Sequence, residues 1–275
     1  MNEIPFYKMS GSGNDFILID NRQGIIGMDD PPAFVAKVCR RAMSVGADGL
    51  ILIEASAQAD FRWRFFNSDG SLPEMCGNGA RCAARFAFLN GIAGADLAFE
   101  TLAGLIEAHV EDDQVRIKMS DPSDLVLDDA IVMADYPLPI SHVNTGVPHV
   151  VMQVKDLAAA NVTAIGHDIR FHPKFQPEGT NVNFIAPTDD GPWAIRTYER
   201  GVEGETLACG TGAVAAALVL ALRYDLASPV ILKTRSGSLL KSYFRRQGER
   251  FDQVCLEGDA RVVYQGLLTP EAWAY

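Results

Sequence analysis

The sequence has few cysteines, few histidines, no long apolar run and no excess of positive charge. The odd cysteine count and the absence of any CxxC spacing argue against a disulfide framework and against a structural zinc site. The longest apolar run, residues 213–222, has about half the length of a membrane-spanning helix. The first residues, MNEIPFYKMSGSGND, lack the basic and apolar regions of a signal peptide. We therefore expect a soluble, cytoplasmic protein with no metal site.

The charge balance restricts the class of partner. The 275-residue chain has a formal net charge of −11 and a sequence pI near 4.9, which argues against binding nucleic acid or an acidic membrane surface. Hydrophobic residues make up 48% and charged residues 21% of the chain, which is typical of a globular protein. We expect a small-molecule substrate, no nucleic-acid partner and no membrane partner, and the sequence leaves a homodimer open.

Hydrophobic patterning predicts more strands than helices. The strands do not alternate regularly with helices, so the predicted class is α+β rather than a series of βαβ units. Three windows are typical of helices: residues 32–43, 79–89 and 213–222. The last window is apolar on every side and predicts a helix that is buried all round. Short runs typical of strands, bounded by Gly, Pro, Asn and Asp, are residues 16–19, 50–53, 62–66, 115–119, 150–154, 183–185, 194–198 and 230–233.

One nine-residue pattern occurs twice, about half the chain length apart. CGNGARCAA begins at Cys76 and CGTGAVAAA begins at Cys209, and six of the nine positions agree. Each copy follows an aromatic, strand-like segment and a polar turn, and each leads into an Ala-rich helix. Two unrelated Gly-rich turns with structural cysteines would share neither this order nor this spacing. The pattern therefore predicts a duplicated chain of two similar halves.

The repeated pattern suggests a particular chemistry. A helix N-terminus offers unpaired N–H donors and a partial positive charge, which favour a bound carboxylate and a cysteine thiolate. Two such turns facing each other across a cleft would place one sulfur on each side of a bound carbon acid. One thiolate would remove the α-proton and the opposite thiol would deliver a proton to the other face. No segment resembles a pyridoxal-phosphate site, so we expect no cofactor, although a lysine Schiff base stays open as an alternative.

Several segments resemble the motifs of the diaminopimelate epimerase family, in the family's order and at about its spacing. They are KMSGSGNDF (8–16), FNSDGSLPEMCGNGARC (66–82), TGVPHVV (145–151), GTNVNF (179–184) and YERGVEGETLACGTGA (198–213). The resemblance implies two pseudo-symmetric domains, each a mixed or antiparallel sheet wrapped round a central helix, with the active site in the cleft between them. It implies a cofactor-independent isomerase that interconverts LL- and meso-2,6-diaminopimelate, on the route to lysine and peptidoglycan. We expect the first domain to comprise residues 1–120 and 266–275, and the second to comprise residues 121–265.

The resemblance also implies the site residues. Cys76 and Cys209 match the two catalytic thiols. Arg200 would hold the distal carboxylate, and Glu199 and the asparagines would accept hydrogen bonds from the distal ammonium. The positions that match substrate-binding residues are Asn14, Asn67, Gly77, Asn78, Asn181, Glu199, Arg200, Gly210 and Thr211. The chain departs from the family pattern at Ser10, Gly49 and Val147, where many members carry His, Gln and Asn.

Plainer interpretations stand beside these roles. Asn14 and Asn67 lie in turns and are candidates for structural turn residues, and Glu199 with Arg200 would by themselves be a solvated surface pair. His149 is either a ligand contact or a structural histidine. The remaining cysteines are expected to pack in the core; they are Cys39, Cys82 and Cys255.

Three other functions remain open on the sequence. One is another two-base isomerase of the same fold, such as a proline or hydroxyproline racemase or a phenazine-type isomerase. The second is a non-catalytic amino-acid-binding protein, which would need no cysteine on both sides of the ligand. The third is a redox-regulated protein in which Cys76 and Cys209 form a disulfide.

Overall fold

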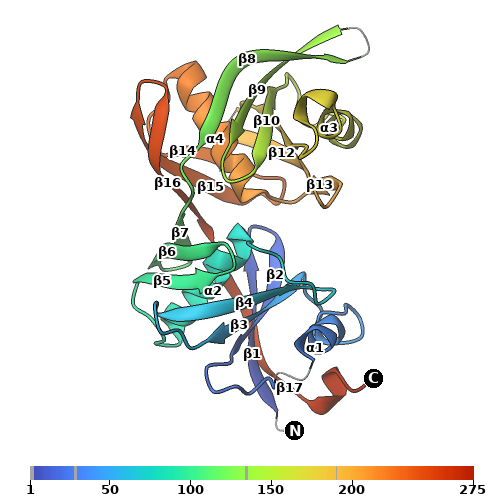
Figure 1. Cartoon of the computed structure of the whole chain (residues 1–275), viewed down its shortest axis with the longest axis vertical. Helices are drawn as coiled ribbons and strands as arrows, with labels where there is room; N and C mark the ends of the chain where they lie inside the picture. The colour runs from blue at the N-terminus through green and yellow to red at the C-terminus, as the bar shows by residue number, and fades with distance from the viewer. Residues whose placement is uncertain (1–2, 28–29, 134–135, 190) are drawn as a thin grey trace. The chain divides into compact units, whose positions relative to one another are not determined.

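The computed structural model describes residues 3–27, 30–133, 136–189 and 191–275. The chain folds into two compact units, residues 1–117 with 258–275, and residues 118–257. Figure 1 traces the chain through both units. In the described part of the chain, no helix combines the length and apolar character that a membrane span requires.

The first unit is a mixed sheet with two helices. Its strands pair in the order β17, β1, β2, β3, β4, β5, β6, β7, with parallel pairs at β2–β3 and β4–β5 and antiparallel pairs elsewhere. The helices are α1 (Pro31–Val38) and α2 (Gly77–Leu89), and a 3₁₀ turn follows at Pro270–Ala272. The strands are β1 (Ile4–Gly11), β2 (Asn14–Asp20), β3 (Gly49–Glu54), β4 (Phe61–Asn67), β5 (Asp96–Thr101), β6 (Gly104–Glu111), β7 (Gln114–Lys118) and β17 (Arg261–Leu268).

The second unit has the same plan. Its strands pair in the order β8, β9, β10, β11, β12, β14, β15, β16, with parallel pairs at β10–β11 and β12–β14. The helices are α3 (Val162–Arg170) and α4 (Gly210–Tyr224), with a 3₁₀ turn at Pro173–Phe175. The strands are β8 (Ser123–Met133), β9 (Tyr136–Asn144), β10 (Pro148–Gln153), β11 (Asn181–Ala186), β12 (Trp193–Glu199), β13 (Gly204–Thr206), β14 (Val230–Lys233), β15 (Leu239–Gln247) and β16 (Arg250–Asp259).

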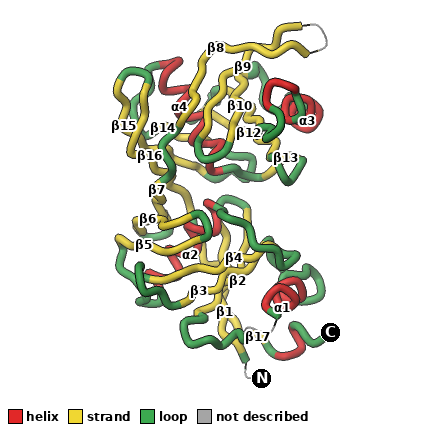
Figure 2. The backbone as a smooth tube through the Cα atoms, in the orientation of Figure 1, coloured by secondary structure: helices red, strands yellow, loops and turns green. Residues whose placement is uncertain are grey.

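The two pairing patterns match strand for strand, except that the second unit has an additional short strand, β13, paired antiparallel with β12. In both units two antiparallel pairs are followed by a parallel, an antiparallel and a parallel pair, and then by two more antiparallel pairs. A short helix, α1 or α3, connects the first parallel pair, and a long helix, α2 or α4, connects the second (Figure 2). The predicted α+β fold of two similar halves is confirmed.

α4 is buried because its sequence offers almost no polar face to water, and α2 is buried mainly through its alanines and aromatic residues. α4 packs on strands β9, β10, β11, β12, β14 and β15, and its residues Ala213 to Ala221 are all buried. The apolar window 213–222 therefore predicted this environment correctly. α2 packs on β1, β2, β3 and β6 and carries its alanines inward.

The short helices were predicted less well. α1 ends at Val38 rather than at Met43, because the N–H of Gly46 bonds the carbonyl of Val38 and folds the chain back toward β3. α3 was not predicted, since its Val, Thr and Gly residues have low helix propensity. It forms because Asn161 caps its N-terminus, accepting from the N–H of Ala164, and because its inner face packs on a second core.

Each short helix covers a core on the sheet face opposite the long helix. Below α1, the core is built round Ile17, Leu50 and Phe66, and below α3 round Val150, Phe184 and Tyr198. Gly166 marks the closest approach in the second of these cores, since a Cβ at this position would lie 2.4 Å from the Cβ of Tyr198.

We predict that Gly166→Ala destabilises the protein. A glycine-to-alanine change inside a helix ordinarily stabilises by about 1 kcal/mol, but here the added methyl overlaps Tyr198, and overpacking costs about 1–3 kcal/mol. Urea unfolding of the variant should show a lower free energy of unfolding. Gly204→Ala is the matched control, because a Cβ at Gly204 meets nothing within 4 Å. A Gly166→Ala variant as stable as Gly204→Ala would contradict the tight packing of α3 on β12.

Candidate active site

In the first unit Cys76 lies at the N-terminus of α2. It is the N-cap residue, with extended backbone (φ −148°, ψ 111°), and its carbonyl accepts the first helical bond from the N–H of Ala80 at 2.8 Å. Its side chain makes no capping bond and is half-buried. The thiol is thus held beside the N–H groups and positive end of the helix, where a thiolate or a bound carboxylate is stabilised.

The amides of Asn78 and Asn14 meet beside this helix end. Asn78 Nδ2 donates to Asn14 Oδ1 at 2.7 Å, and Asn14 Nδ2 donates to Asp48 Oδ2 at 2.9 Å. Asn78 is buried, whereas Asn14 is half-buried. The structure therefore brings Asn14 to Asn78 and the neighbouring Cys76, although Asn14 and Asn78 lie 64 positions apart in the sequence.

A group of charges fixes the loop that carries Asn14. Arg41 Nη2 bonds both Asp15 Oδ1 (2.5 Å) and Asp48 Oδ1 (2.9 Å), and Lys8 pairs with Asp15 Oδ2 at 2.8 Å. Burial works against the charged form of Asp15, but Arg41 and Lys8 outweigh it and lower the pKa of Asp15 to about 2. Asp48 is therefore anchored while it accepts from Asn14.

Asn67 has a structural role in its turn. Its Nδ2 donates to Ser71 Oγ at 2.9 Å, and its N–H donates to the carbonyl of Ser71. The strand partner of Asn67 is Gly49. A Cβ at Gly49 would lie 2.5 Å from the carbonyl oxygen of Phe66. The backbone is thus packed too closely here for the Gln that some family members carry.

In the second unit Cys209 occupies the matching place on α4. It is the N-cap residue (φ −123°, ψ 115°), and its carbonyl accepts from the N–H of Ala213 at 2.9 Å. Its Sγ lies 3.5 Å from Thr211 Oγ1. The carbonyl of Thr211 accepts from Thr145 Oγ1 at 3.0 Å, which ties the cysteine turn to the loop after β9.

The last glycine of each cysteine motif is required where the helix approaches the sheet. A Cβ at Gly212 would lie 2.2 Å from Asn183 Oδ1, and a Cβ at Gly79 would lie 3.3 Å from Ile51 Cδ1. In the preceding turn, a Cβ at Gly210 would lie 2.8 Å from Leu256, whereas Gly77 has space. The glycines therefore let each helix begin against its sheet, which fixes the position of the cysteine in front of it.

Asn181, Glu199 and Arg200 lie together at the ends of β11 and β12. Asn181 Oδ1 accepts from the N–H of Arg200 at 2.9 Å, and its Nδ2 donates to the carbonyl of Pro148 at 3.1 Å. Arg200 Nη1 donates to the carbonyl of Glu178 at 2.9 Å. Burial raises the pKa of the Glu199 carboxyl, and a cation that reaches it would favour its charged form.

His149 is part of this cluster and is fully buried. Its Nδ1 lies 3.1 Å from Asn183 Nδ2, and its Nε2 has no hydrogen-bond partner in the described part of the chain. Burial, with the nearby charge of Arg200, lowers the pKa of His149 to about 3. The ring is therefore neutral at neutral pH, and Nδ1 accepts from the Asn183 amide.

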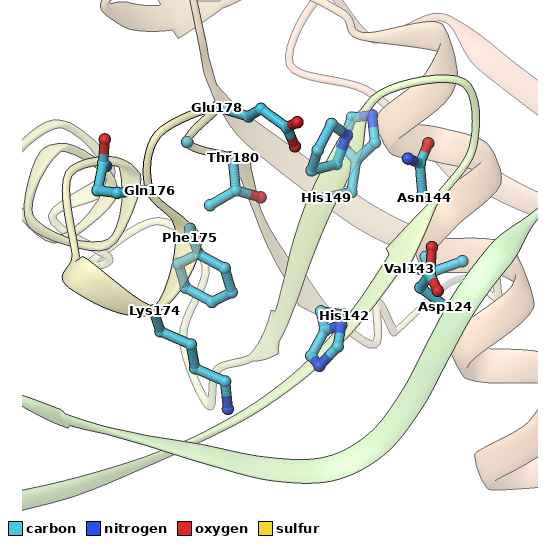
Figure 3. Close-up of a pocket in the computed structure, with 12 residues that line it drawn as sticks. Asp124, His142, Val143, Asn144, His149, Lys174, Phe175, Gln176, Glu178 and Thr180 are labelled. Atoms are coloured by element: carbon cyan, nitrogen blue, oxygen red, sulfur yellow. The ribbon is translucent and has the colours of Figure 1, made fainter.

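A pocket of about 250 Å³ opens in the second unit next to these residues. Figure 3 shows His149, Glu178 and Thr180 at one side of it and His142 and Lys174 at another. Lys174 and His142 both contact Asp129, so the ammonium of Lys174 already has an anionic partner. The pocket adjoins the Asn181–Arg200 cluster through Pro148 and Thr180.

The other cysteines differ in burial. Cys39 and Cys82 are buried as predicted, and burial raises the pKa of each to about 12, so both remain thiols. The prediction for Cys255 was wrong: it is half-buried, because along β16 Val254 and Leu256 face the core and Cys255 alternates to the other face. No disulfide joins any of the five cysteines, all of which the structure describes.

Sequence reasoning missed three polar residues of these sites. They are Asp48, which anchors Asn14, Thr145, which bonds the second cysteine turn, and Arg81, which is fully buried in α2. Arg81 lies within the repeated motif. A charged residue among the alanines of a predicted buried helix was the signal that could have identified it. In the described residues, His, Cys, Asp and Glu side chains form no group of three that could hold a metal ion.

The chain is similar in sequence to known proteins over nearly its whole length. The profile of the family described as diaminopimelate epimerase matches residues 6–125 and 141–263. Diaminopimelate epimerases of Aquifex aeolicus and Chlorobaculum tepidum are 45% and 44% identical to the chain, over 99% and 95% of it and over the whole of each relative.

Solved structures share the fold at low identity. A phenazine biosynthesis protein of the PhzF family from Bacillus anthracis superposes with a TM-score of 0.73 at 16% identity, covering 98% of this chain and 100% of that one. A probable proline racemase from Agrobacterium radiobacter superposes with a TM-score of 0.69 at 16% identity, covering 98% and 95%. The family profile and the full-length relatives decide the assignment: the chain belongs to the diaminopimelate epimerase family.

Proposed function

We propose that this chain is an epimerase that interconverts LL- and meso-2,6-diaminopimelate, with Cys76 and Cys209 as its acid and base. The observation that carries the proposal is the repeated cysteine at the N-terminus of a buried helix, found in both units of a chain that belongs to this family. A reaction that inverts one carbon needs a proton acceptor on one face of that carbon and a proton donor on the other, each able to act as acid and as base. The duplicated chain supplies one in each half.

The helix N-termini support this chemistry. The α-proton of an amino acid is weakly acidic, and the charge that develops on the α-carboxylate as the proton leaves must be stabilised. The N–H groups of Gly77 and Asn78, and of Gly210 and Thr211, are first-turn donors without an intrahelical acceptor. We assign these four residues to the carboxylate at the reacting carbon. The proposal includes no cofactor.

The second unit supplies charges for the distal end of the substrate. Arg200 is a fork of N–H donors suited to a carboxylate, and Glu199 is a half-buried carboxyl whose charged form an ammonium would favour. Asn181 holds the backbone of Arg200 through its Oδ1. We propose that Asn181 positions Arg200 for the distal carboxylate of the substrate. We assign Asn14 and Asn67, at the ends of β2 and β4, to substrate binding in the first unit. Racemases of small cyclic amino acids share the fold at 15–16% identity, and this likeness shows the fold alone.

The activity is tested by incubating the protein with LL-diaminopimelate in D₂O. We expect meso-diaminopimelate to accumulate, with one deuterium at the inverted α-carbon, because the proton delivered comes from a thiol in exchange with solvent. Chiral chromatography with mass spectrometry measures both quantities. Conversion of L-proline at a comparable rate, with diaminopimelate unchanged, would show that the substrate assignment is wrong.

The two-thiol mechanism predicts that either cysteine is indispensable for inversion. Cys76→Ala and Cys209→Ala should each lower kcat by at least about 1000-fold, because removing one member of an acid–base pair costs its whole contribution. The remaining thiol should still exchange the α-proton at its own face, without inversion. Cys255→Ala is the matched control and should keep wild-type kcat. If either alanine variant inverts the substrate at near wild-type rate, the two-thiol mechanism fails.

The proposed contact between Arg200 and the distal carboxylate predicts a preference for diaminopimelate over lysine. Lysine lacks the distal carboxylate, and the lost charge-assisted bonds are worth about 3 kcal/mol, or roughly a hundredfold in kcat/KM. Arg200→Met should remove most of this preference by lowering kcat/KM for diaminopimelate alone. Arg245→Met, an exposed arginine paired with Asp252, is the control and should leave the preference unchanged. The proposed contact of Arg200 with the distal carboxylate is excluded if Arg200→Met keeps the wild-type ratio of kcat/KM for diaminopimelate to kcat/KM for lysine.

A further inference from the structure

His149 carries a buried nitrogen that no group of the described chain satisfies. The side chain is almost completely buried, and its Nε2 has no hydrogen-bond partner among the described residues. Buried polar atoms of proteins are nearly always paired, so an unpaired one requires an explanation. His149 is also one of the residues that line the pocket of Figure 3. Whether Nε2 can donate or accept a hydrogen bond there depends on which ring nitrogen carries the proton.

The amide of Asn183 decides where the proton of His149 lies. Asn183 Nδ2 lies 2.9 Å from the carbonyl oxygen of Val150 and 3.1 Å from His149 Nδ1. A carbonyl oxygen only accepts, so the atom that faces it must be the amide nitrogen with its two N–H donors. One N–H donates to Val150, and the other is left for the imidazole. Because the ring faces a donor, Nδ1 must accept.

The ring has a single proton to place. Burial, together with the positive charge of Arg200, lowers the pKa of His149 to about 3, so the imidazole is neutral at neutral pH. A neutral imidazole has one protonated and one unprotonated nitrogen. Since Nδ1 accepts from Asn183, the proton lies on Nε2. The unpaired atom of His149 is therefore a hydrogen-bond donor.

Two further contacts hold the Asn183 amide in this orientation. Thr197 Oγ1 donates to Asn183 Oδ1 at 2.9 Å. The N-terminus of α4 packs against the same oxygen, because a Cβ at Gly212 would lie 2.2 Å from it. Turning the amide over would bring its oxygen against the carbonyl of Val150 and would break the bonds at both ends. The orientation of the amide, and with it the proton on His149, is thus set by buried neighbours.

The first unit shows that the fold does not require these polar side chains. Strand register gives the matching positions, which are all apolar: Phe16 for His149, Ile51 for Asn183 and Phe65 for Thr197. The match agrees with the helix packing, because a Cβ at Gly79 would meet Ile51 as one at Gly212 would meet Asn183. The first set is also buried, and its two rings pack edge to face at 5.8 Å. The same backbone plan therefore forms without polar groups here, which indicates that the second unit keeps them for its site.

We propose that Asn183 is a positioning residue that holds His149 as the Nε2–H tautomer, so that the ring presents a hydrogen-bond donor to an oxygen of the bound substrate. The amide lies directly behind the second cysteine turn, since a Cβ at Gly212 would lie 2.2 Å from Asn183 Oδ1 and 3.3 Å from Cys209 Sγ. A substrate carboxylate brings the acceptor that the described residues do not supply to Nε2. The inference rests on the proposed function for the identity of the ligand, but the tautomer can be measured in the free protein.

The test is the position of the ring proton, read from two-bond ¹H–¹⁵N NMR spectra of the full chain labelled with ¹⁵N-histidine. Such spectra distinguish a protonated ring nitrogen from an unprotonated one. At neutral pH wild-type His149 should show a protonated Nε2 and an unprotonated Nδ1. Its signals are assigned by their loss in His149→Phe, which introduces the side chain found at the matching position of the first unit. A protonated Nδ1 in the wild-type protein overturns the proposal.

Two variants separate the amide nitrogen from its surroundings. Asn183→Asp replaces the N–H donor by a carboxylate acceptor of nearly the same shape and should move a proton to Nδ1 of His149, because a carboxylate beside Nδ1 favours Nδ1–H. Thr197→Val is the matched control. It removes the hydroxyl but keeps the Val150 carbonyl that orients Nδ2, so Nδ1 should stay unprotonated. If Asn183→Asp is folded by circular dichroism and its Nδ1 is still unprotonated, Asn183 does not set the tautomer. If that variant does not fold, the wild-type spectrum decides.

Donation to the substrate is tested by adding diaminopimelate to the same sample. The Nε2 resonance of His149 should shift on titration, and the ring should stay in the Nε2–H tautomer, whereas the exposed His167 of α3 should not respond. Binding is measured separately by calorimetry. If diaminopimelate binds and the Nε2 resonance does not move, donation to the substrate is overturned. If diaminopimelate does not bind, the proposed function fails, while the tautomer still decides the role of Asn183, so the two proposals fail separately.

Discussion

The burial of α2 and α4 against their sheets is the constraint on which the rest of the structure depends. α4 is apolar on nearly every side and α2 over most of its surface, so both must be covered, and each sheet supplies strands on several sides of its helix. The N-terminal N–H groups of such a helix have no intrahelical acceptor. The helix therefore presents a row of donors at the point where the chain enters it, and in both units a cysteine stands at that point.

The glycines of each cysteine motif let its helix begin close to the sheet, which fixes the position of the helix N-terminus. Gly212 allows α4 to begin against Asn183, and Gly79 allows α2 to begin against Ile51. Since the helix cannot move away from its sheet without opening the core, the cysteine before it is fixed as firmly as the core itself. The position of each cysteine thus follows from the apolar packing of the helix behind it.

The two halves share a backbone plan but differ in their polar networks. Apart from the additional β12–β13 pair of the second unit, the strand pairings repeat between the units, whereas the buried polar residues do not. The first unit carries Arg81 among neutral acceptors, and the second carries neutral His149 bonded to Asn183. A duplicated fold can thus keep its backbone plan and its two cysteines while the buried polar residues around them diverge.

The sequence by itself determined the strand-rich α+β class, the repeated cysteine motif and the buried helix at 213–222, because each depends on local pattern: period, composition and repeated order. It did not determine the length of α1, the existence of α3 or the outward face of Cys255, since these follow from how the chain folds back and from strand register. Only the tertiary structure brought Asn14 to Asn78 and Asn181 to Arg200. It alone revealed that Arg81 is fully buried, because a side chain's burial depends on segments far away in the chain.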